Sequence, residues 1–210
     1  MNVMAMARAE RADLAGFLDM LRPEQWDAPS LCSGWRVRDV VAHVISYEEH
    51  GTADFVKRFA RARLRPRHLN DVALADYSHR SPEALLEFLH SHLEPRGATA
   101  RFGGGVGLVD GLIHHQDIRR PLGMPRTIPT ERLLYALPFA VTAPPLRGFW
   151  TARGVRLIAT DLDWTRGKGP EARGTAEALL MTMAGRREAV RELVGPGATI
   201  LQNRLVFTPT

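Results

Sequence analysis

Cysteine is almost absent from this chain of 210 residues, in which Cys32 is the only one. A single thiol excludes an intramolecular disulfide framework and a zinc module built on several cysteines. The chain also lacks an apolar run long enough to span a membrane, because three prolines interrupt its longest apolar stretch, residues 133–146. We therefore expect no membrane partner.

Lysine is scarce as well, since Lys57 and Lys168 are the only two among 28 basic residues. With 23 acidic residues the net charge is +5, which raises the question of nucleic-acid binding. The arginines are interleaved with Asp and Glu, however, and no run of five basic residues occurs. We therefore expect no nucleic-acid partner. Arginine also suits the capture of carboxylates and phosphates, which leaves an anionic substrate open.

The N-terminal segment MNVMAMARAERADL carries Arg and Glu where a signal peptide needs an apolar stretch. This pattern predicts a cytoplasmic protein. The 45% of hydrophobic and 24% of charged residues are typical of a globular chain, and the length allows one large domain or one domain with a small appendage.

Apolar residues recur at helical spacing through most of the first 145 residues. Ser81-Pro82-Glu83 is a typical helix start, with Ser as the N-cap and Pro at the first helical position. The pattern predicts helices over residues 7–21, 35–63, 81–93 and 108–120, and a fifth that starts at 129 and ends before Pro144. Helices joined in antiparallel order favour an up-down four-helix bundle.

The pattern changes after about residue 150. The run VRLIAT at 155–160 is apolar and partly β-branched, which predicts a strand. Helical segments are predicted at 174–184 and 187–194, and a last strand at 199–207. We therefore predict a mainly α fold, with a helical-bundle domain over 1–147 and a small α+β domain over 148–210.

Three residues on two predicted helices are candidate metal ligands. Asp110 and His114 are four residues apart and share one helix face, whereas His115 points about 100° away. A carboxylate and an imidazole at this spacing, with His43 from a facing helix, would resemble the metal sites that helical bundles build in their interior. Three such ligands suit a catalytic zinc with an open position, or ferrous iron. The alternative is that His43 and His114 are ordinary hydrogen-bonding residues between helices.

Two motifs resemble the mycothiol-dependent maleylpyruvate isomerase family, part of the DinB-like helical bundles. The first lies in the segment ERADLAGFLDMLRPEQWDAPSLCSGWRVRDVVAHV, and its matching positions are Trp26, Pro29, Ser30, Cys32, Gly34, Trp35, Val37, Asp39 and His43. The second is shorter and consists of Asp110, His114, Asp117 and the ending at 121–123. Residues 154–186 are similar to the small C-terminal domain of that family. The resemblance covers most of the chain except 61–101.

This resemblance implies that His43, Asp110 and His114 ligate a divalent metal, commonly zinc, and that mycothiol is the thiol cofactor. Family members usually carry Glu at the position of Asp110, whose side chain is one methylene shorter. The implied function is a metal-dependent thiol transferase or isomerase acting on a small electrophilic substrate. The alternative is a bundle protein that binds a metal or small ligand without catalysis.

Further residues near these motifs receive weaker assignments. Arg119 and Arg120 are candidates for binding the anionic thiol cofactor, with solvent-facing charges at a helix end as the alternative. Asp39 and Asp117 are candidates for orienting the two histidines. Cys32 is expected to be structural rather than a nucleophile, and no catalytic residue is assigned. The substrate is expected to be a small molecule, and the oligomeric state is open between monomer and homodimer.

Overall fold

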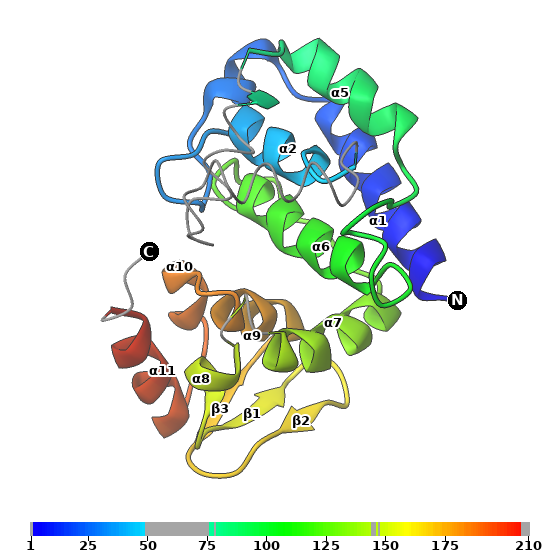
Figure 1. The fold of residues 1–210 in the computed structure, drawn as a ribbon. Helices are drawn as coiled ribbons and strands as arrows, with labels where there is room; N and C mark the ends of the chain where they lie inside the picture. The colour runs from blue at the N-terminus through cyan, green and yellow to red at the C-terminus, as the bar shows by residue number, and fades with distance from the viewer. Residues whose placement is uncertain (1, 49–75, 78, 144–145, 147, 207–210) are drawn as a thin grey trace, which may run out of the picture. The chain divides into compact units, whose positions relative to one another are not determined.

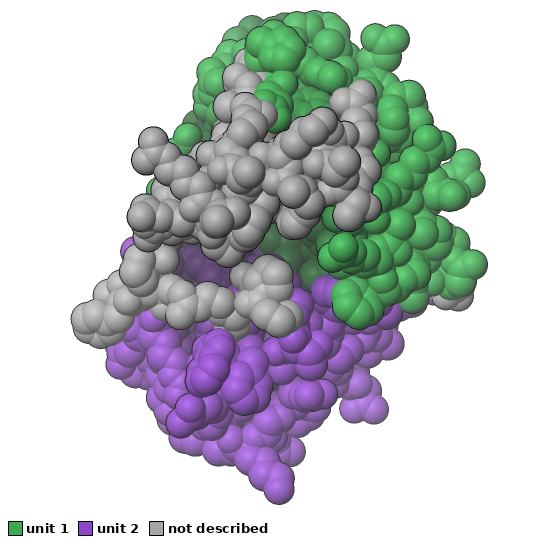
Figure 2. Space-filling view, viewed as in Figure 1, with its two compact units in different colours: residues 1–125 green, residues 126–210 purple. Residues whose placement is uncertain are grey.

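The computed structural model describes residues 2–48, 76–77, 79–143, 146 and 148–206 (Figure 1). Contacts within the chain divide it into two compact units, Met1–Pro125 and Arg126–Thr210 (Figure 2). The first unit is helical in its described part, and the second combines helices with a small sheet. Among the described residues, no helix has both the length and the apolar character needed to cross a membrane.

Four helices of the first unit pack as a bundle, and each has two neighbours. They are α1 (Val3–Leu18), α2 (Val37–Ile45), α5 (Pro82–Ser91) and α6 (Gly105–Arg119). Both α1 and α2 pack against α5 on one side and α6 on the other, as Figure 1 shows. The predicted helical bundle is therefore confirmed. A short 3-10 helix, Pro23–Asp27, lies in the connection between α1 and α2.

Side-chain caps determine where several helices begin. Asn2 accepts a hydrogen bond from the Ala5 amide at 2.7 Å, so α1 starts four residues earlier than its apolar spacing predicts. Ser81 caps α5 as expected, accepting from the Ala84 amide at 3.3 Å. In each case a side-chain oxygen satisfies an amide that has no partner within its own helix.

Helix α2 is shorter than predicted. It ends at Ile45, where the Ser46 amide bonds back to the carbonyl oxygen of His43 and the Ser46 hydroxyl donates to the same oxygen. These local bonds compete with continuation of the helix. The rest of the segment predicted as helix, from 49 to 63, lies outside the described residues.

The valine spacing of α2 does place its apolar face in the core. Val37, Val40, Val41 and Val44 are each no more than 1% exposed. They pack in a cluster with buried residues of α1, α5 and α6, namely Leu14, Phe17, Leu18, Leu85, Leu89 and Ile118. Burial of this apolar surface is the main stabilising term for the bundle.

Helix α6 is buried on nearly all sides, including its polar residues. His114, His115, Gln116 and Asp117 are all buried. Two glycines allow the neighbouring chain to come close. A Cβ at Gly111 would lie 3.3 Å from Glu10 of α1, and one at Gly107 would lie 3.0 Å from Pro95. Because buried polar groups need partners, α6 is the place to look for a functional cluster.

The second unit is a three-stranded sheet with helices. The strands are β1 (Arg156–Ala159), β2 (Thr165–Arg166) and β3 (Glu171–Gly174), and β1 lies in the centre, antiparallel to β2 and parallel to β3. The helices are α7 (Thr130–Thr142), α8 (Gly148–Ala152), α9 (Ala176–Met183), α10 (Arg187–Val190) and α11 (Pro196–Val206). Helix α7 packs on α9, so contacts divide the chain after residue 125, and the predicted boundary at 147 lies inside the second unit.

The second unit differs from the prediction at α11 and β3, and β2 and α8 were not predicted either. The predicted strand at 199–207 is wrong, because α11 occupies Pro196–Val206. Its buried residues Ala198, Leu201 and Leu205 lie on one helical face. Strand β3 was missed because its four residues, EARG, show no apolar run. Its position follows from parallel pairing with β1, in which Ala172 lies opposite Leu157.

Candidate metal centre

The structure brings together the three predicted ligands inside the first unit. The Nε2 atom of His114 lies 3.5 Å from Asp110 Oδ1, and the Nε2 atom of His43 lies 3.8 Å from the same oxygen. The two imidazole rings are 4.7 Å apart between centroids. Helix α6 supplies Asp110 and His114 one turn apart, and α2 supplies His43 across the bundle.

The separations of these donor atoms fit a small divalent ion. A zinc ion binds histidine nitrogen and carboxylate oxygen at about 2.0–2.2 Å, so two tetrahedral ligand atoms lie about 3.3–3.6 Å apart. The two separations from Asp110, 3.5 and 3.8 Å, are close to that spacing, and all three donor atoms lie within 4.8 Å of one another. Asp110 therefore reaches the two imidazoles despite its short side chain. Three protein donors leave a fourth position for a small molecule.

Asp110 and His114 shift each other's pKa, because a carboxylate and an imidazole lie side by side. Burial raises the pKa of the Asp110 carboxyl, but the positive charge of His114 and hydrogen bonds from His114 and His43 outweigh it and hold this pKa well below its usual range. Burial lowers the pKa of His114, while Asp110, Asp117 and Cys32 together raise it well above its usual value. Without a metal, the cluster therefore holds a carboxylate beside a protonated imidazole.

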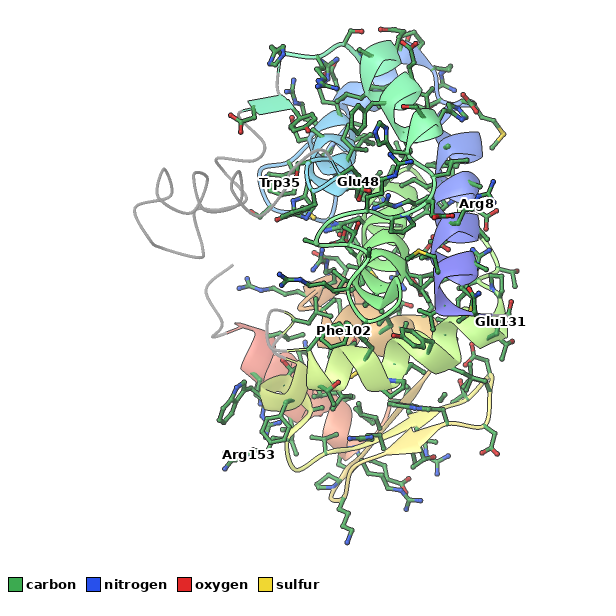
Figure 3. All side chains as sticks on the ribbon, turned by 45° about the vertical axis from the view of Figure 1, so that its right-hand side comes forward. Arg8, Trp35, Glu48, Phe102, Glu131 and Arg153 are labelled. Atoms are coloured by element: carbon green, nitrogen blue, oxygen red, sulfur yellow. The ribbon has the colours of Figure 1, made fainter. Side chains whose placement is uncertain are left out.

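Exposure differs among the three side chains. Asp110 is 26% exposed, whereas His43 and His114 are 7% and 11% exposed. Aromatic rings flank His43: its ring centroid lies 5.1 Å from Trp35, labelled in Figure 3, and 5.5 Å from Tyr47. Solvent therefore contacts the cluster mainly at Asp110, and the His43 side is apolar.

Asp39 does not orient His43, contrary to the suggestion from the sequence. Its carboxylate accepts from the Arg36 amide at 2.9 Å and from the Arg36 guanidinium at 3.1 Å. Asp39 thus closes the N-terminal turn of α2, where acidic side chains are favoured. The role of Asp39 in the structure is therefore to cap the N-terminus of α2.

Asp117 does contact a predicted ligand. Its Oδ2 atom lies 2.9 Å from Nδ1 of His114, and the side chain is fully buried. Cys32 joins the same group, with its Sγ atom 3.2 Å from Asp117 Oδ2 and 3.8 Å from His114 Nδ1. In the chain, Cys32 lies between the predicted helices 7–21 and 35–63, far from His114. Its contact with α6 arises only from the fold.

His115 points away from the cluster, as its position on the helix predicts. Its Nδ1 atom lies 3.0 Å from Glu10 of α1, and the Arg119 Nε atom donates to its Nε2 at 2.8 Å. The His115 and Glu10 side chains are completely buried. His115 is therefore a hydrogen-bonding residue between α1 and α6.

Replacing His115 with alanine is expected to lower the free energy of unfolding by about 1–3 kcal/mol, because Glu10 and Arg119 each lose a buried partner. The number of metal ions per chain is expected to stay unchanged. Urea unfolding and elemental analysis of the purified variant measure the two effects. Loss of metal from a folded His115→Ala protein would contradict the assignment of ligands on α6.

The two candidate cofactor-binding arginines end α6. Arg119 donates to His115 and, through Nη1, to the Met124 carbonyl at 3.0 Å, and its guanidinium lies 3.9 Å from the Phe17 ring centroid. These contacts hold Arg119 against the bundle, which differs from a solvent-facing charge. Arg120 is half-buried at the C-terminal cap of the helix. Cofactor binding by either arginine stays a prediction.

The described fold and cluster define a class of protein: a four-helix bundle with a carboxylate and two imidazoles of metal-ligand type in its interior. The mycothiol maleylpyruvate isomerase N-terminal domain family matches residues 7–119 of the chain. Because this match covers more than half of the chain, the protein belongs to that family. The resemblance seen in the sequence motifs is confirmed.

Two solved structures are similar over 93% of this chain and 92% of theirs. One is a mutant of the mycothiol-dependent maleylpyruvate isomerase, with 16% sequence identity and a TM-score of 0.61. The other is the mycothiol-dependent maleylpyruvate isomerase itself, with 14% identity and a TM-score of 0.54. They confirm the predicted DinB-like fold class. No curated protein sequence matches the chain. Family membership supports the expectation that the protein is an enzyme.

Proposed function

We propose that the protein is a metal-dependent isomerase or transferase that uses a low-molecular-weight thiol, mycothiol in the first instance, on a small electrophilic substrate. The metal is held by His43, Asp110 and His114, and zinc is the first candidate because two imidazoles, one carboxylate and an open position form a zinc donor set. The observation that carries the proposal is the convergence of these three donor atoms within 4.8 Å, with both histidines buried and Asp110 partly exposed.

The chemistry that a divalent ion supplies when bound at such a site is polarisation, which lowers the pKa of a ligated thiol or water. The side chains of this protein prepare the site for it. Two imidazole nitrogens and one carboxylate oxygen face one another, so the net charge of the donors is −1 when both imidazoles are neutral. Trp35 and Tyr47 beside His43 limit the access of water.

Asp117 completes the arrangement because its carboxylate accepts a hydrogen bond from Nδ1 of His114, the ring nitrogen that faces away from Asp110. When His114 is neutral, that bond leaves the Nε2 lone pair directed at the donor cluster. Arg119 and Arg120 stay the candidates for an anionic group of the thiol cofactor, because arginine binds carboxylates and phosphates in a fixed geometry.

Elemental analysis of protein purified without a polyhistidine tag tests the metal, and about one divalent ion per chain is expected. An assay on activated double bonds, with and without added thiol, tests the chemistry. We expect turnover that requires the thiol and is lost on chelation. His90→Ala is the matched control, because His90 is an exposed imidazole on α5 that pairs with Asp19. It is expected to retain both metal and turnover.

Two results would overturn the proposal. Protein without metal after reconstitution with zinc, iron or manganese would exclude the metal site. A metal-loaded protein that binds the thiol without any thiol-dependent turnover would favour a ligand-binding bundle.

A further inference from the structure

One carboxylate oxygen in the bundle, Oδ2 of Asp117, lies within hydrogen-bond distance of two other side chains. Asp117 Oδ2 lies 2.9 Å from His114 Nδ1 and 3.2 Å from Cys32 Sγ. The Cys32 thiol donates to this oxygen, and Nδ1 of His114 lies within hydrogen-bond distance of it. The Nε2 atom on the other side of the same ring faces Asp110.

Backbone hydrogen bonds also hold the segment around Cys32 against Asp117. The Leu31 amide donates to the Asp117 carbonyl oxygen at 3.0 Å, next to the Cys32 thiol in the chain. Ser30 in turn accepts from the Cys32 amide at 3.1 Å and donates to the Trp35 carbonyl at 2.9 Å. The link that precedes α2 is thereby tied to the last turn of α6.

We propose that Cys32 is a positioning residue for the metal site: its thiol donates to Asp117, and the two residues together fix the orientation of the His114 ring. The inference rests on the proposed function, because it assigns His114 as a ligand. It goes further by giving a role to the lone cysteine, 85 residues from its partner in the chain.

A competing arrangement uses Cys32, His114 and Asp117 as metal ligands themselves, since their donor atoms also lie within 4.8 Å of one another. The distances favour hydrogen bonding. The 2.9 Å between His114 and Asp117 is a normal hydrogen bond and is shorter than the roughly 3.3 Å between two ligand atoms of one zinc ion.

Three variants test the contacts that lead from the Cys32 thiol through Asp117 to His114. Cys32→Ser keeps a donor of similar size, Cys32→Ala removes it, and Asp117→Asn keeps the shape but loses the charge that accepts both bonds. Zinc affinity, measured by competition with a chromogenic chelator, is expected to be near that of the unsubstituted protein for Cys32→Ser. It is expected to fall about 10-fold for Cys32→Ala and 10- to 100-fold for Asp117→Asn. Circular dichroism confirms that each variant is folded.

A second measurement does not depend on metal. Cys32 is the only cysteine in the chain, so the infrared S–H stretching band belongs to it alone. A thiol that donates to a carboxylate absorbs at lower frequency than a free thiol, because the bond weakens S–H. The band is expected to move to higher frequency in Asp117→Asn. An unchanged band would overturn the proposal.

The cobalt(II)-substituted protein distinguishes Cys32 as a positioning residue from Cys32 as a metal ligand. An intense thiolate-to-cobalt band that disappears in Cys32→Ser would make Cys32 a ligand and overturn the positioning role. Zinc affinity in Cys32→Ala equal to that of the unsubstituted protein would overturn the inference and leave the proposed function intact. Failure of the unsubstituted protein to bind zinc or cobalt would instead overturn the proposed function, and with it the role of Cys32.

Discussion

Replacing Asp110 with alanine is expected to weaken metal binding by more than 100-fold. Asp110 Oδ1 is the atom that both imidazoles face, at 3.5 and 3.8 Å, so its removal leaves two neutral donors and no negative charge. Loss of a residue that only supports a ligand costs about 10- to 100-fold, and loss of a ligand costs more. Equilibrium dialysis against zinc, with circular dichroism to confirm folding, measures the effect.

Asp110→Glu is the conservative control for Asp110→Ala. Glutamate keeps the charge and adds one methylene, and the 26% exposure of Asp110 leaves room for the longer side chain. We expect the variant to bind metal with an affinity close to that of the unsubstituted protein, as its family resemblance at this position implies. Equal metal binding by Asp110→Ala and the unsubstituted protein would show that Asp110 is not a ligand.

Helical periodicity was enough to predict the parts of the site that lie on one element. Asp110 and His114 share a face because they are four residues apart, and His115 contacts α1 because it is one residue further on. The facing position of His43 required the bundle arrangement, which the antiparallel order of the helices and the family resemblance predicted. The roles of these residues as ligands stay predictions, whereas their proximity is a feature of the structure.

Helical periodicity cannot predict contacts that a loop makes with a helix. Cys32 lies near Asp117 because a loop crosses the end of α6, and no periodic pattern relates residues in a loop to a helix face. The wrong prediction of a strand where α11 lies has a different cause. Residues 199–207 are rich in β-branched and large apolar residues, which favours a strand locally, but packing of Leu201 and Leu205 on one face stabilises a helix.

The second large effect is expected at Glu48, where the structure buries an ion pair that the sequence analysis did not find. The Glu48 side chain is completely buried, and that of Arg11, its partner on α1, is 2% exposed. Glu48 also accepts from the Thr99 hydroxyl at 2.6 Å and the Arg96 amide at 2.8 Å. Glu48, labelled in Figure 3, therefore connects α1, the end of α2 and the segment before α6.

Glu48→Ala is expected to lower the free energy of unfolding by about 3–5 kcal/mol, because it leaves the Arg11 cation buried without its counter-charge. Urea unfolding followed by circular dichroism measures this loss. Asp27→Ala is the matched control: Asp27 pairs with Arg36 and Arg38 at half-exposed positions, where a pair contributes at most about 1 kcal/mol. The double change Arg11→Met with Glu48→Leu removes both charges and is expected to recover much of the stability. Glu48→Ala as stable as Asp27→Ala would mean that water or another group compensates Arg11, and the double variant would then show no recovery.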